Sequence, residues 1–198
     1  HFPYTYYLTQ SEIAFGVGNF NHGFRTPSSI FYLNSIFYLP IIKYNFFQIG
    51  AILIMGFSSY QFFYLVKEKL KKKKYDKFFF LSLFFFMFTV IFFYRIAEHG
   101  TDRSAQILIF LLIIELLIII NFNKGTKESI IKILIILGLV ISLKSFYILY
   151  LAFSFPVFYY FIIDKKFSSI LLIFKSYYFY LFLLLFGNIL LVNFANSG

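Results

Sequence analysis

Ionisable side chains gather in one short polar segment, RIAEHGTDRSAQ at residues 95–106, between two strongly apolar runs. The groups able to do chemistry there are Arg95, Glu98, His99, Asp102 and Arg103. A carboxylate, an imidazole and a guanidinium held together can bind an anion, polarise a bond and move a proton. We therefore take Asp102, Glu98 and His99 as candidate catalytic residues.

Three cations lie at the ends of apolar runs, away from the lysine-rich segments: Arg95, Arg103 and Lys144. Guanidinium and ammonium groups pair strongly with phosphate oxygens, so all three are candidate phosphate-binding residues. The alternative is that these long side chains only extend to the membrane surface. The N-terminal segment adds two polar candidates, His22 and Arg25.

Plainer roles compete for the acidic residues. Asp102 stands two residues before an apolar run, where a carboxylate also caps a helix or meets the positive end of its dipole. Glu98 and His99 are each compatible with an ordinary loop residue. No His-x-x-x-His or Glu-x-x-His spacing occurs, so the sequence indicates no dedicated metal site. We expect no cofactor, with a divalent metal as the alternative.

The composition is that of a membrane protein. Of the 198 residues, 61% are hydrophobic and 13% charged, and the mean hydropathy is +0.81. This leaves too few polar groups to cover a soluble domain, and the absence of cysteine excludes disulfides and thiolate-bound metals. The net charge of +10 comes mainly from lysines beside apolar runs, which indicates membrane orientation rather than binding to nucleic acid.

We predict an all-α, polytopic transmembrane bundle. Residues 1–45 form an outer-face loop with interfacial or re-entrant helices, and 46–198 form a single transmembrane domain. The six expected spans are 46–66, 78–94, 104–121, 129–143, 145–163, which Pro156 should kink, and 176–192. Because the chain begins at His1 and stops directly after an apolar run, we expect it to be an internal piece of a longer protein.

Charge orients these spans. Thirteen of the eighteen basic residues fall on one side, in or beside the connections at 67–77, 124–132 and 165–175. By the positive-inside rule, that side is cytoplasmic. The outer side then holds the N-terminal segment, Asp102 and Lys144. Glu115 lies within a span, where it should face protein or be protonated.

Several segments resemble GT-C-type integral-membrane glycosyltransferases. Their outer-loop segment is similar to NHGFRTPSSIFYLNSIFYLP. The place where a loop Asp introduces their next crossing is similar to GTDRSAQILIFLLIIELL. Their basic residue before a tight turn is similar to that in LGLVISLKSFYILYLAF. The order of these motifs is closest to that in an uncharacterised bacterial membrane-protein family related to the transferases. In that family an acidic residue and a Tyr-His-x-Pro-Tyr stretch precede an Asn-x-His loop.

This resemblance implies a sugar donor linked to polyprenyl phosphate and used at the outer face of a bacterial plasma membrane. It places the main catalytic base of the family upstream of His1. Asp102 then corresponds to the family's second acidic position, and Lys144 corresponds to the basic residue at its tight turn. Expected partners are the bilayer, the lipid-linked sugar and a glycan or lipid acceptor of cell-surface glycan assembly. This chain departs from the transferase pattern in two ways. The loop before Asp102 is longer and richer in charge than is typical, and no Asp-x-Asp pair occurs.

Other classes of protein remain compatible with the sequence. A polysaccharide polymerase, ligase or flippase would also display an outer basic and aromatic face. A multi-span transporter would require functional charge near the middle of the membrane, for which Glu115 and Pro156 are the only signs. A non-catalytic membrane protein is the plainest alternative.

Overall fold

The computed structural model describes residues 2–20, 24–93, 101–122, 127–157, 159 and 174–197. Within these ranges the chain is all-α, and the only β-type pairing is an isolated bridge between Leu39 and Lys43. The α-helices are α1 (Phe2–Gln10), α2 (Ser29–Ile36), α3 (Ile49–Lys71), α4 (Lys77–Phe92), α5 (Thr101–Phe122), α6 (Lys127–Leu143) and α9 (Tyr177–Ser197). The 3₁₀ helices are η1 (Val17–Asn19), η3 (Tyr44–Phe46) and η4 (Ser145–Ser154).

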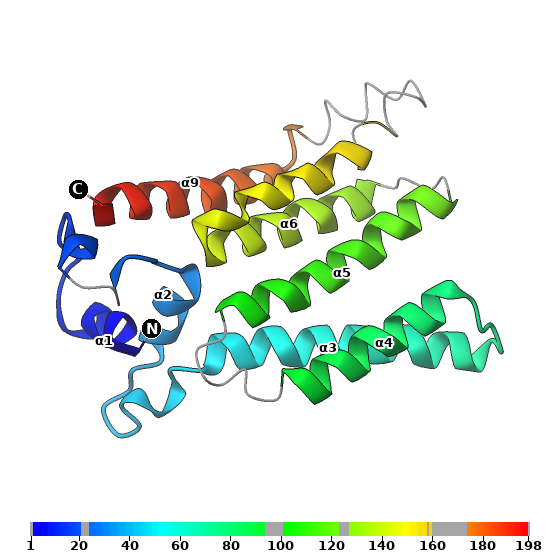
Figure 1. Cartoon of the computed structure of the whole chain (residues 1–198), viewed down its shortest axis with the longest axis horizontal. Helices are drawn as coiled ribbons and strands as arrows, with labels where there is room; N and C mark the ends of the chain where they lie inside the picture. The colour runs from blue at the N-terminus through cyan, green and yellow to red at the C-terminus, as the bar shows by residue number, and fades with distance from the viewer. Residues whose placement is uncertain are drawn as a thin grey trace.

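The long helices lie side by side: α3, α4, α5 and α6 alternate in direction, and α9 runs parallel to α6 (Figure 1). α3 packs against α4 and α5, α5 packs against α6, and α6 packs against both α9 and η4. The short helices α1 and α2 lie at the end where α5 begins and α6 ends, which we call the Asp102 end. The opposite end, where α3 ends and α4 begins, is the lysine end.

The core lies between α5 and α6. Ile107 and Leu112 of α5 and Leu137 and Val140 of α6 are fully buried. By contrast, large apolar side chains on α3, α4 and α9 face outward, and Phe57 and Leu191 are each 70% exposed. A surface this apolar is what a lipid bilayer would cover.

Three helices of the described residues are long and apolar enough to cross a membrane: Tyr44–Lys71, Thr101–Asn121 and Tyr177–Ser197. They match three of the six predicted spans, at 46–66, 104–121 and 176–192, so the described residues contain three candidate spans rather than six. The helices at the second and fourth predicted spans, α4 and α6, have 16 and 17 residues. At about 1.5 Å per residue these two fall short of the roughly 30 Å of a hydrocarbon core.

The fifth predicted span, 145–163, is not a regular α-helix where it is described. Its first ten residues form the 3₁₀ helix η4, and the Phe155 N–H donates to the Ala152 carbonyl. Pro156 has no N–H, so it cannot make the bond to Ala152 that an α-helix would require there. The prediction of a kink therefore understated how far the backbone departs from α geometry.

Both ends of α3 are closed by bonds that satisfy its free backbone groups. At its start, the buried Asn34 side chain of α2 accepts the Gly50 N–H at 2.9 Å. At its end, the Lys73 N–H donates to Leu70 and the Lys74 N–H to Lys69, with Lys73 at φ 50°. This is a Schellman motif, which more commonly uses glycine at that position. It turns the chain sharply into α4.

Gly138 of α6 tests the packing of α6 on α9. A Cβ at Gly138 would lie 3.2 Å from the Phe182 ring, whereas Gly187 of α9 has open space around its Cα. We expect Gly138→Leu to cost about 1–3 kcal/mol of stability through overpacking. Gly187→Leu should be neutral or slightly stabilising, since leucine forms helix better than glycine. Thermal unfolding in detergent, followed by circular dichroism, measures both variants. Equal effects would contradict the close packing.

Candidate functional site

An ion-pair cluster joins α5 to the turn between α6 and η4. The Lys144 ammonium donates to Asp102 Oδ1 at 3.1 Å, and the Tyr147 hydroxyl donates to the same oxygen. Asp102 is in the first turn of α5, and Lys144 directly precedes η4. Two residues that lie 42 positions apart in the chain and were predicted independently as site residues therefore meet.

Helix geometry explains this meeting. α5 and α6 pack antiparallel, so the start of one lies beside the end of the other. Lys144 is the extended residue directly before η4, and its carbonyl accepts the Tyr147 N–H at 3.0 Å, a bond that brings the two residues together at the start of η4. The Tyr147 residue is only 8% exposed, whereas the side chains of Asp102 and Lys144 are 56% and 34% exposed. The phenol thus holds a carboxylate that remains open to solutes.

The N-terminal segment is fixed to this same end by polar and aromatic contacts. The hydroxyls of Ser29 in α2 and Ser142 in α6 lie 2.8 Å apart and share a hydrogen bond. Tyr4 of α1 is fully buried, and its hydroxyl lies 3.3 Å from that of Tyr32. Burial, helped by this hydrogen bond, raises the pKa of Tyr4, so the phenol stays neutral.

A polar cavity of about 490 Å³ lies between the N-terminal segment and the end of α9. Its polar lining residues are Asn19, Arg25, Asn193, Asn196 and Ser197. The Asn19 side-chain amide donates to the Ser197 carbonyl at 2.9 Å, and the Gly16 N–H donates to the Ala195 carbonyl at 2.7 Å. The segment thereby satisfies carbonyls in the last turn of α9.

Gly18 allows the close approach that forms this cavity. A Cβ at Gly18 would lie 2.7 Å from the Asn196 backbone oxygen, a distance that no larger residue tolerates without a backbone shift. Asn196 is 2% exposed and donates to the Phe24 carbonyl, while its side-chain oxygen has no hydrogen-bond partner in the described part of the chain. That oxygen is an unused acceptor among the groups around the cavity.

The predicted site residues fall into three groups. Asp102 and Lys144 form the cluster, and Arg103 follows Asp102, half-buried, on α5. Arg25 lines the polar cavity instead. The other predicted residues, Arg95, Glu98, His99 and His22, lie outside the described residues.

Tyr147 and the amides of α9 were missed by the sequence analysis. Tyr147 had one usable signal, its spacing of three residues from Lys144. Asn193 and Asn196 had none, because their role depends on contact with residues some 170 positions earlier in the chain.

Glu115 faces protein, one of the two possibilities predicted for it. Its carboxylate lies 3.5 Å from the Lys132 ammonium across the contact between α5 and α6. Among the described residues, no three His, Cys, Asp or Glu side chains gather closely enough to hold a metal ion.

A double-mutant cycle measures the coupling free energy between Asp102 and Lys144. Asp102→Asn, Lys144→Gln and the double variant should reveal a coupling of about 0.5–1 kcal/mol, because the pair is partly exposed. Unfolding of all four proteins in one detergent gives this energy, and added salt should reduce it. Strictly additive effects would show that the pair does not form in solution.

No known protein family, curated protein or solved structure matches the chain. Its function must therefore be inferred from its own residues and their geometry.

Proposed function

We propose that the chain forms part of a membrane glycosyltransferase that takes sugar from a polyprenyl-phosphate carrier at the outer face of the membrane. The observation that carries the proposal is the meeting of Asp102, Lys144 and Tyr147 at one end of an apolar bundle. A cation held by a carboxylate at that depth suits a lipid-linked phosphate, because the phosphate of such a carrier lies where the hydrocarbon ends.

In this proposal the protein is a multi-pass protein of a bacterial plasma membrane, with its lysine end in the cytoplasm. The long helices separate the two ends of the bundle (Figure 1). Lys69 and Lys72 lie at the lysine end, whereas Asp102 and Lys144 lie at the other. This separation supports opposite sides of the membrane for lysine-rich and mixed-charge segments.

The proposed reaction is a displacement at the anomeric carbon of the sugar. The acceptor oxygen forms a bond to this carbon, the bond from carbon to phosphate oxygen breaks, and the acceptor proton passes to the Asp102 carboxylate. Lys144 stabilises the charge that develops on the leaving phosphate. Asp102 orients Lys144, and Tyr147 orients Asp102. The polar cavity beside Arg25 offers amide donors and acceptors that suit sugar hydroxyls.

A purely structural role for the cluster is the competing explanation, since the same contacts would also tie α5 to η4. The chain contains a matched control for this possibility. Asp76 and Lys69 form a second pair of an acid and a lysine at the lysine end, far along the bundle from Asp102. If either pair had only a structural role, its removal should change folding but not sugar transfer by the folded protein.

Asp102→Asn and Lys144→Gln should each lower sugar transfer at least 100-fold, in the range of losses seen on removal of a catalytic proton-transfer or charge-stabilising group. Asp76→Asn should stay within twofold of the parent. The assay measures transfer from radiolabelled polyprenyl-phosphate hexoses in membranes containing the full-length protein, with each variant present at equal amounts.

Near-normal transfer by the Asp102 and Lys144 variants would rule out the proposed site. Equal losses in all three variants at equal protein levels would assign the cluster a structural role.

A further inference from the structure

An apolar cavity lies at the lysine end, between α3, α4 and α5. It has a volume of about 160 Å³ and is lined by Leu65, Lys69, Phe78, Ser82, Ile114 and Ile118. Leu65 and Ile118 are partly exposed, so the cavity reaches the outer surface of the helices. An apolar cavity of about 150 Å³ is large enough to admit benzene, so this one can hold a stretch of roughly six carbons of an alkyl chain.

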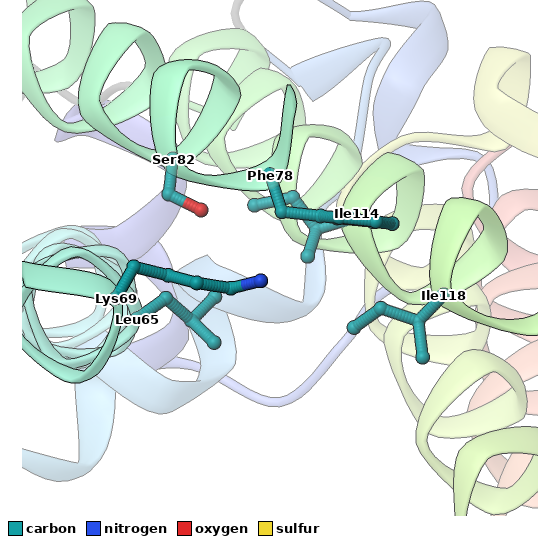
Figure 2. Close-up of a pocket in the computed structure, with 6 residues that line it drawn as sticks. All are labelled: Leu65, Lys69, Phe78, Ser82, Ile114 and Ile118. Atoms are coloured by element: carbon teal, nitrogen blue, oxygen red, sulfur yellow. The ribbon is translucent and has the colours of Figure 1, made fainter. Parts of the chain in front are cut away.

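Two polar groups point into this cavity. Figure 2 shows the Ser82 oxygen and the Lys69 ammonium directed toward the same space from α4 and α3. Ser82 is 1% exposed, and its hydroxyl has no hydrogen-bond partner among the described residues. A buried hydroxyl without a partner costs free energy, so it calls for an acceptor that the polypeptide does not provide there.

Lys69 is held at the rim of the cavity. Its ammonium donates to the Asp76 carboxylate and lies 5.4 Å from the centre of the Phe78 ring. The hydrogen bond from Lys69 holds the pKa of Asp76 below its usual value, so this carboxylate stays charged at neutral pH. An ammonium has three donors, which leaves capacity for an anionic oxygen beside Asp76.

The surrounding segment is strongly basic. Residues 67–77 contain seven lysines against Glu68 and Asp76. Lysine clusters next to an apolar helix attract anionic lipid head groups. The charge and the cavity therefore meet at one place: Lys69 of the basic segment lies at the rim, and an apolar space with a hydroxyl donor lies below.

We propose that this cavity binds an anionic phospholipid. Its phosphate contacts Lys69 and neighbouring lysines, and an ester carbonyl accepts a hydrogen bond from the Ser82 hydroxyl. One acyl chain lies along Leu65, Ile114 and Ile118. The site is independent of the proposed transferase activity, since it lies at the opposite end of the bundle from Asp102.

Lipid binding to the full chain in a neutral maltoside detergent tests the proposal. Phosphatidylglycerol and phosphatidylcholine with identical acyl chains are titrated, and bound lipid is counted by native mass spectrometry. We expect phosphatidylglycerol to bind at least tenfold more tightly. Ser82→Leu, which fills the cavity without changing charge, and Lys69→Gln should each weaken it at least fivefold. Lys72→Gln, in the same basic segment but outside the cavity lining, should weaken it less than twofold.

Ile118→Phe fills the cavity from α5 and replaces Ser82→Leu if that variant does not fold. Equal affinity for the two lipids would overturn the proposal. It would also be overturned if phosphatidylglycerol bound the cavity-filling variants as tightly as the parent, because the lipid would then bind to surface charge alone.

Discussion

The antiparallel packing of α5 against α6 is the contact on which the rest of the structure depends. Its interface contains the fully buried Ile107, Leu112, Leu137 and Val140, and the outer helices add to it from both sides. The same packing fixes which polar groups can meet. It brings the start of α5 to the turn after α6, and it pairs Glu115 with Lys132 farther along. One apolar interface thus sets the positions of two ion pairs.

The two ends of the bundle differ in how their polar groups are used. At the Asp102 end, hydroxyls and amides satisfy backbone groups of neighbouring elements, as Asn34 does for Gly50 and Asn19 for Ser197. At the lysine end, charge remains near the surface, and Ser82 keeps an unused hydroxyl beside an apolar cavity. A site for a sugar and its linking phosphate and a site for a membrane phospholipid would therefore suit opposite ends.

Run length and charge were enough to predict α3, α5 and α9 and the common location of Asp102 and Lys144. Run length did not predict the 3₁₀ geometry of Ser145–Ser154, which precedes the missing backbone donor of Pro156. Spacing alone did not identify Tyr147, since its place beside Lys144 depends on the backbone bond from the Tyr147 N–H to the Lys144 carbonyl. Lys73 at φ 50° breaks the preference for glycine, so no local pattern marked the end of α3. The contacts of Asn34 and Asn196 depend on tertiary packing and have no sequence signature.

Sidedness is the central claim of this account, and the absence of native cysteine makes it directly measurable. Single cysteines replace Ser11, an exposed residue of the N-terminal segment, and Lys72 at the lysine end. Spheroplasts are treated with a membrane-impermeant maleimide before and after lysis. The account predicts that Ser11→Cys reacts in intact spheroplasts and that Lys72→Cys reacts only after lysis. Labelling of both positions before lysis, or of neither, would put the two ends on one side and contradict it.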